Sequence, residues 1–321
     1  MPSILRGDNT TLIPEDYAEG ILKNATEKSA VMQLARTRRM SRKQQRMSVL
    51  SSLPTVSWVT GSDTDVGLKA TTNVSWANLL LNAEPLAAIV PIAEDLLDDQ
   101  DYNLWDDIKP LLEQEIAAAI DGAVFFGTGA PATFPTALVT QAVSAGNTVN
   151  AGTGVDIAAD VNSAMGAVES DGYYPSGFVM RMAEKAVLRG LRDVNRQFLF
   201  SPKGPSNVGV SNAAYVGELY GERAYISNVG LTGFSEASTN TRYITGDFRQ
   251  LVFGIRSDMT YTVLKEATLY NPDGSVMVAL AQQDMVALRV VMRCGWQVTN
   301  PVTKANANNA TRFPFAVVRI A

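Results

Sequence analysis

Residues 94–129, EDLLDDQDYNLWDDIKPLLEQEIAAAIDGAVFFGTG, decide the fold of this chain. An acidic segment opens the stretch, and apolar residues then recur every three or four positions. These apolar residues are Trp105, Ile108, Leu112, Ile116, Ile120 and Val124. Because that spacing draws one stripe along a helix, the pattern predicts a long helix with one buried face.

Two residue types indicate where this helix bends and stops. Proline lacks a backbone N–H, so Pro110 is predicted either to bend the helix or to mark the end of its first turn. Gly127 and Gly129 can adopt the left-handed backbone that closes a helix C-terminus, so the helix is predicted to end at Phe126. The short run Gly127-Thr128-Gly129 is interpreted as this stop rather than as a phosphate-binding loop.

The composition is that of a globular chain without a membrane segment. Its 321 residues, 46% of them apolar, suffice for one large or two ordinary domains. No run of about 18 apolar residues occurs, and the N-terminus lacks the layout of a secretory signal. We therefore expect a cytoplasmic location. Cys294 is the only cysteine and lies in an apolar run, which predicts a buried, inert thiol.

The chain contains no histidine, and this absence excludes much of enzyme chemistry. Ser-His-Asp and Cys-His arrangements, and metal sites with histidine ligands, are ruled out. No P-loop, dinucleotide-binding glycine motif or EF-hand loop occurs. The residues therefore predict no catalytic, cofactor or metal site. A carboxylate-dependent enzyme using Asp98, Asp99 and Asp101 remains a distant alternative.

Charge is distributed in two opposed blocks although the net charge is only -5. Residues 84–121 hold eleven acids and the single base Lys109. The basic block consists of Arg36, Arg38, Arg39, Arg42, Lys43 and Arg46. The two blocks could pair within one chain, where exposed pairs contribute about 0–1 kcal/mol each, or between copies. The basic block could also touch nucleic acid, but it lacks interleaved aromatic residues.

The N-terminal part is predicted to form two extended segments, called limbs below. Residues 1–45 resemble an arm with little core of its own, and residues 48–90 read as a long β-hairpin. The hairpin strands are predicted at 55–59 and 73–76, around a turn at 60–67. A two-stranded hairpin is barely stable alone, so Trp58 and Trp76 need a surface, either their own domain or a neighbouring subunit.

The remainder reads as a compact α/β region followed by mostly β structure. Helices are predicted at 156–170 and 183–193, and strands at 177–180, 223–226, 250–255, 259–264, 285–296 and 315–320.

Several short phrases occur in a characteristic order along the chain. They are LPTVSWV at 53–59, EDLLDD at 94–99, FGTG at 126–129, GFVM at 177–180, GDF at 246–248, FGIR at 253–256 and DMVALR at 284–289. Together with the order of elements, they resemble a tailed-phage major capsid protein of the HK97-like fold.

The resemblance implies an α+β chain divided into named parts. These are an N-terminal arm (1–47), an extended E-loop hairpin (48–90), a P-domain (91–149) with a spine helix at about 103–126, an A-domain (150–245), P-domain strands (246–300) and a C-terminal return to the A-domain (301–321).

The implied function is to build, from hexamers and pentamers, an icosahedral head that encloses double-stranded DNA. Implied partners are other copies of the chain, a portal protein, scaffolding or decoration proteins, and DNA contacted non-specifically. Assembly would occur in the cytoplasm of a bacterial host. The unsupported limbs and opposed charges agree with an interlocking subunit. A mildly acidic chain suits a container that confines DNA without binding it tightly. An encapsulin-type shell, which shares this fold, is the alternative.

The candidates for inter-subunit contact are Arg36, Arg38, Arg39, Arg42, Trp58, Lys69, Trp76, Asp98 and Asp99. Some family members crosslink a lysine near the E-loop tip to an asparagine of a neighbour, and Lys69 occupies about that place. The late strands offer Gln282, Gln283 and Asp284 instead of a matching asparagine and glutamate, so no crosslink is expected. The arm starts almost at Met1, so we expect scaffolding to be separate, already removed or unnecessary.

Overall fold

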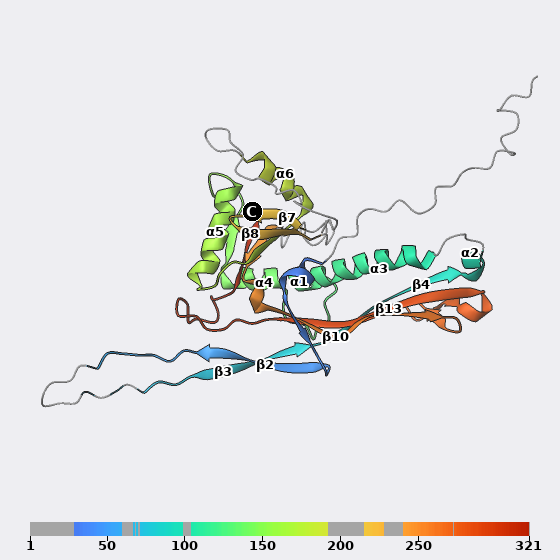
Figure 1. Ribbon diagram of the computed structural model, residues 1–321, viewed down its shortest axis with the longest axis horizontal. Coiled ribbons are helices and arrows are strands. Elements are labelled where there is room, and N and C mark those ends of the chain that lie inside the picture. The colour runs from blue at the N-terminus through green and yellow to red at the C-terminus, as the bar shows by residue number, and fades with distance from the viewer. Residues whose placement is uncertain are drawn as a thin grey trace, which may run out of the picture.

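The computed structural model describes residues 29–59, 67, 69, 71–98, 104–191, 215–227, 240–271 and 273–320. Within these residues the fold is mixed α/β, with a four-stranded sheet, a six-stranded sheet and two separate two-stranded hairpins, one long and one short. One hairpin extends far from the rest of the chain, and helix α3 runs along the four-stranded sheet (Figure 1). The predicted helix-and-strand composition is therefore confirmed.

The four-stranded sheet has the order β1-β10-β13-β4. Its strands are β1 (Arg36–Arg39), β10 (Leu251–Leu264), β13 (Met285–Val298) and β4 (Glu84–Ala93). Only the β1–β10 pair is parallel. The two strands predicted at 250–255 and 259–264 form a single strand, β10, whose register shifts near Ser257. The polar residues at this irregularity interrupt the apolar pattern without ending the strand.

Helix α3 (Leu104–Asp121) confirms the periodic stripe predicted from the sequence. Leu112, Ile116 and Ile120 are buried in a core shared with residues of β10 and β13. The helix continues as a π-helical turn, η2 (Gly122–Phe126), and ends at Gly127, whose φ of 76° is left-handed. The predicted stop is therefore confirmed. Pro110 lies inside α3 beyond the first turn, so the interpretation that it ends that turn is wrong.

The six-stranded sheet has the order β5-β14-β9-β6-β8-β7. Its strands are β5 (Thr148–Asn150), β14 (Phe315–Arg319), β9 (Thr241–Gly246), β6 (Gly177–Met180), β8 (Glu222–Ile226) and β7 (Tyr215–Leu219). Helices α4 (Leu138–Ala145), α5 (Ile157–Ser170) and α6 (Met182–Gly190) accompany it. The elements predicted at 156–170, 177–180, 223–226 and 315–320 are confirmed. The helix predicted at 183–193 is α6, which ends at Gly190.

The long hairpin pairs β2 (Gln44–Ser52) with β3 (Ser75–Asn82). The strand predicted at 55–59 is wrong, because these residues carry no strand, and the strand predicted at 73–76 is confirmed only at 75–76, where β3 begins. The strands pair instead at the root of the hairpin, which is the end next to the four-stranded sheet. Met47 and Leu81 are buried there with Val252 of β10. Farther out, the Thr55 amide still donates to the Thr72 hydroxyl at 2.8 Å. The turn predicted at 60–67 lies mostly outside the described residues.

Short elements complete the described chain. They are the helices α1 (Ala30–Leu34), α2 (Glu94–Asp98), η3 (Phe248–Gln250) and η4 (Leu280–Gln282), and the hairpin strands β11 (Thr268–Tyr270) and β12 (Val276–Ala279).

A buried arginine organises the loop that carries the chain from β13 to β14. Arg312 is 3% exposed, and its guanidinium donates to the carbonyls of Asn306 and Asn300, each at 3.0 Å. Asp171 accepts from the Phe313 amide at 3.0 Å and from Asn147 at 2.9 Å. Because β13 and β14 belong to different sheets, this network holds the connection between the two sheets.

Candidate inter-subunit surfaces

The outer part of the hairpin exposes large apolar side chains. Trp58 is 100% exposed, Val56 is 92% exposed and Trp76 is 66% exposed. Leu50 lies opposite Trp76 in the β2–β3 register, so Trp76 stands near the end of the paired strands. Lys69 is also exposed. Within the described part of the chain, the two tryptophans therefore lie uncovered by the domains to which they belong.

Most of the basic block lies on one edge of the four-stranded sheet and in the turn after it, and only Arg46 lies in β2. β1 pairs with β10 on one side only, and the side chains of Arg36, Arg38 and Arg39 are exposed. Met40 then returns to the core, and its amide donates to the Ile255 carbonyl at 2.9 Å. Arg42 is exposed as well, and none of these four arginines forms an ion pair with another described residue. The edge therefore presents unpaired positive charge.

The predicted pairing of opposed blocks within one chain occurs at a single ion pair in the described part of the molecule. Lys43 lies 3.1 Å from Glu84, and the Thr133 hydroxyl donates to the same carboxylate at 3.0 Å. These two hydrogen bonds hold the pKa of Glu84 below its ordinary value. Glu94 instead pairs with Lys265, at 3.3 Å. Asp98 ends α2, and Asp99 lies outside the described residues.

A buried carboxylate that sequence reasoning missed joins three segments. Asp121, at the end of α3, is 2% exposed. Its oxygens accept from the amides of Ala30 at 2.9 Å and Val31 at 3.1 Å. They also accept from the hydroxyls of Ser29 and, at 2.7 Å, Ser227. Burial raises the pKa of Asp121 although these hydrogen bonds act in the opposite direction.

The position of Asp121 carries a weak signal in the sequence. Asp121 lies next to Ile120 and three residues before Val124 of the buried stripe, and burying a carboxylate is costly, so it needs another reason to be there. Its contacts with Ser29, Ala30 and Val31 supply that reason. They fasten the described beginning of the N-terminal region to the end of α3.

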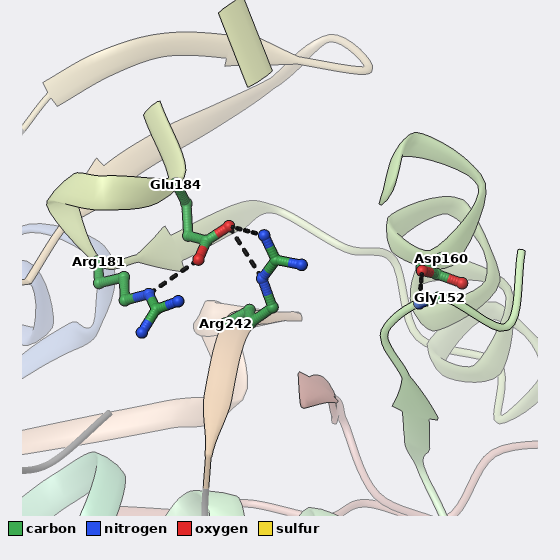
Figure 2. Close-up of polar contacts among 5 residues, drawn as sticks. All are labelled: Gly152, Asp160, Arg181, Glu184 and Arg242. Atoms are coloured by element: carbon green, nitrogen blue, oxygen red, sulfur yellow. Dashed lines mark hydrogen bonds and ion pairs between the residues drawn. The ribbon is translucent and has the colours of Figure 1, made fainter. Parts of the chain in front are cut away.

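A second set of buried charges stabilises the six-stranded sheet region. Figure 2 shows Glu184 held between Arg181, at 2.8 Å, and Arg242, at 2.6 Å, and Asp160 beside the Gly152 amide. Burial raises the pKa of Glu184, but the hydrogen bonds from Arg242 and Arg181 outweigh it and leave the pKa lowered. These carboxylates are used to fix α6, β9 and the loop before α5.

The described residues offer no other reactive centre. No group of histidine, cysteine, aspartate or glutamate among them could hold a metal ion. Cys294 is buried as predicted, and burial raises the pKa of its thiol to about 11. Of the three carboxylates considered for an enzyme, Asp99 and Asp101 lie outside the described ranges. Across those ranges, no helix combines the length and the apolar character needed to cross a membrane.

A helix packed along a mostly antiparallel sheet, a separate α/β region and a projecting hairpin together match the subunit fold of phage capsid structures. The chain belongs to the phage capsid family, whose family model matches residues 9–304. The resemblance to tailed-phage major capsid proteins is thereby confirmed.

Individual relatives align with this chain over nearly its whole length. The major capsid protein of Staphylococcus phage 80alpha is 23% identical over 317 residues, covering 93% of this chain and 87% of the relative. A structure from Microbacterium phage Oxtober96 is 33% identical, with a TM-score of 0.81 and complete coverage of both chains. A structure from Mycobacterium phage Adephagia is 28% identical, with a TM-score of 0.82, and covers 100% of this chain and 99% of the other.

Proposed function

We propose that this chain builds the icosahedral head of a tailed phage, in which its copies associate as hexamers and pentamers around double-stranded DNA. The observation that supports the proposal is the projecting hairpin, on which Trp58 is fully exposed and is covered by none of the described residues. An aromatic side chain buries about 150–250 Å² when it is covered, which corresponds to roughly 4–6 kcal/mol before the costs of association. In the proposed shell, a neighbouring copy supplies that burial.

The proposed division of the chain follows the family resemblance. α3 with η2 serves as the spine helix, the four-stranded sheet forms the P-domain, and the six-stranded sheet forms the A-domain. We keep the arm at 1–47 and the E-loop at 48–90, although β2 begins at Gln44 and β4 already lies in the four-stranded sheet. β14, in the six-stranded sheet, is the C-terminal return to the A-domain.

Specific contacts between copies follow from the charges and the exposed apolar groups. Trp58 and Trp76, with Lys69 nearby, would lie on the P-domain of a neighbour. The exposed arginines of the basic edge, Arg36, Arg38, Arg39 and Arg42, would face the acidic segment around Asp98 and Asp99 of another copy. Such pairs stabilise little when exposed but set register between subunits when many occur together.

The remaining partners are proposed on the same ground. The head would carry a portal protein and, depending on the phage, scaffolding or decoration proteins, and it would assemble in the bacterial cytoplasm. DNA would be contacted without sequence preference, because a chain of net charge -5 offers few sites for phosphate. We assign the chain no catalytic role.

Electron microscopy and sedimentation of the purified full chain test this proposal. The expected result is closed shells from the wild-type chain and fewer shells from Trp58→Ala. Tyr174→Ala serves as a matched control, because Tyr174 is 81% exposed but lies outside the hairpin. A wild-type chain that stays monomeric or dimeric under all assembly conditions would contradict the proposal. The encapsulin-type alternative would be supported if particles isolated from cells contained a protein cargo and no DNA.

A further inference from the structure

The four-stranded sheet ends in a short hairpin, on the side of the molecule away from the long β2–β3 hairpin (Figure 1). β10 ends at Leu264, and the chain then forms β11, β12 and η4 before β13 begins. We call the described residues 265–271 and 273–284 the distal tip. The amide of Glu94, at the start of α2, donates to the Asp284 carbonyl at 2.9 Å, so α2 begins beside the distal tip.

The distal tip exposes large apolar side chains. Tyr270 of β11 and Val276 of β12 lie opposite each other in the strand register, and each is more than half exposed. Met277, the next residue of β12, is also more than half exposed. Residues paired across two antiparallel strands lie on the same face, so Tyr270 and Val276 form one exposed apolar surface. Exposed apolar groups that lie together mark interaction sites.

Hydrogen bonds within its turn fix the shape of this hairpin. The Asn271 amide donates to the Ser275 carbonyl at 2.8 Å, and the Gly274 amide donates to the Asn271 carbonyl at 2.9 Å. The carboxylate of Asp273 accepts from the Ser275 amide at 2.9 Å and from the Ser275 hydroxyl at 2.6 Å. Because the hairpin is already ordered, it loses little conformational entropy when it binds a partner.

The distal tip carries negative charge. Lys265 is the only base in residues 257–288 of the sequence, and its ammonium lies 3.3 Å from the Glu94 carboxylate. Several acids at this end of the molecule are exposed. They are Asp95 in α2 and Glu266, Asp273 and Asp284 in the distal tip. The tip and the start of α2 therefore combine exposed apolar side chains with carboxylates.

The basic edge, formed by Arg36, Arg38, Arg39 and Arg42, has the complementary character. These arginines are exposed and form no ion pair with another described residue. A guanidinium group pairs with carboxylates and also stacks on the ring of a tyrosine. The methylene groups of an arginine side chain cover apolar surface while its charge stays in water. A row of arginines therefore fits a partner that presents both carboxylates and an exposed tyrosine.

The distal tip and the basic edge cannot meet within one chain. Arg39, the last residue of β1, pairs with Ile255, whereas the distal tip starts after Leu264 at the other end of β10. At about 3.3 Å per residue this separation is roughly 30 Å, which is much longer than an arginine side chain. The contact therefore needs a second copy. Because it joins two different patches, it connects copies head to tail, as rings of subunits require.

We propose that the distal tip of one copy docks on the basic edge of a second copy. Tyr270, Val276 and Met277 lie against the arginine side chains, and the carboxylates of the tip pair with the guanidinium groups. This inference rests on the proposed function and names one contact within the shell. It adds the apolar residues of β11 and β12 to the pairing of the two opposed charge blocks.

The first test is the subunit concentration at which the purified full chain begins to form shells, measured by light scattering and electron microscopy. Tyr270→Ala should raise this concentration about tenfold or more, because truncation of a central interface aromatic commonly weakens association by at least that factor. Tyr174→Ala is the matched control, since Tyr174 is exposed outside the distal tip. Both variants should keep the urea midpoint of the wild-type subunit.

An exchange of charges identifies the partner surface. Asp95→Arg combined with Glu266→Arg should hinder shell formation, as should Arg38→Glu combined with Arg39→Glu, because each pair of changes places like charges opposite each other. All four changes together should restore shells, since opposite charges then face each other again. Glu169→Arg changes an exposed acid on α5 and should assemble like the wild-type chain.

The outcomes separate this contact from the proposed function. Normal shells from Tyr270→Ala and from the charge-reversed tip would overturn the contact and leave the proposed function standing, because the wild-type chain would still assemble. Failure of the four combined changes to restore shells would overturn the choice of the basic edge as the partner. A wild-type chain that forms no shells would contradict the proposed function itself, and this contact with it.

Discussion

Replacing Asp121 by alanine removes the acceptor that joins the N-terminal region, α3 and the segment after β8. The change leaves the amides of Ala30 and Val31 without their partner, and these backbone groups cannot rotate toward another acceptor. An unpaired buried donor costs about 1–3 kcal/mol, so two of them cost roughly 2–6 kcal/mol. The hydroxyls of Ser29 and Ser227 can rotate and add less.

An opposing effect reduces this loss. The wild-type protein buries a carboxylate without a cationic partner among its hydrogen-bond donors, and burial raises the pKa of Asp121. Removing the charge recovers part of that cost, so we expect Asp121→Ala to lower the free energy of unfolding by about 2–4 kcal/mol. Asp121→Asn keeps one acceptor oxygen without the charge and should lose less than half as much.

The sign of the pH dependence follows from the raised pKa. The folded chain binds this proton more tightly than the unfolded chain does, whose aspartate pKa is about 3.9. The stability contributed by Asp121 is therefore fully present below that pH, and it falls as pH rises through the folded-state pKa. Relative to Asp121→Asn, the wild-type chain should become less stable as pH rises above about 4.

Urea unfolding of unassembled subunits between pH 4 and 8, with hydrogen exchange at Ala30 and Val31, measures both effects. Asp156→Ala is the matched control, because Asp156 accepts one backbone bond at the start of α5, from Ala159 at 2.8 Å. It should cost about 0.5–2 kcal/mol and leave exchange at Ala30 unchanged. If Asp121→Ala is as stable as wild type and its Ala30 and Val31 amides stay protected, the reasoning is refuted.

Three further predictions concern the hairpin, the basic edge and the loop between the sheets. Trp58→Ala should reduce the yield of shells. It should change the unfolding free energy of the subunit by less than about 0.5 kcal/mol, because the side chain is fully exposed in the subunit. A normal shell yield in microscopy would contradict this prediction. Reversing the charges of Arg38, Arg39 and Arg42 together should lower the salt concentration at which shells dissociate in sedimentation experiments. The thermal midpoint of the subunit should stay nearly unchanged. Shells of unchanged salt resistance would contradict this prediction. Arg312→Met should destabilise the chain by about 3 kcal/mol or more, because the carbonyls of Asn300 and Asn306 lose a buried charged donor. Arg249 is exposed, and its side chain has no partner among the described residues, so Arg249→Met should stay within about 0.5 kcal/mol in the same urea titration.

Local features of the sequence were sufficient to predict those helices and strands that are determined by residues close to one another in the chain. The apolar spacing from Trp105 to Val124 and the glycine at 127 specified α3, η2 and the helix stop, because helical period and capping are local properties. The same holds for α5, which begins at its capping residue Asp156. The ordered phrases along the chain were enough to indicate the capsid family, which the family model then confirmed.

Only the tertiary structure decided which residues pair and which are desolvated. The hairpin is formed by 44–52 and 75–82 rather than by the more strand-like 55–59, because burial at the root lies against β10, far away in the sequence. The role of Asp121 depends on amides some 90 positions away, and the need for glycine at Gly295 depends on the close approach of Asn82. Local patterns carry period and caps, whereas pairing, burial and unsatisfied groups depend on contacts between distant residues.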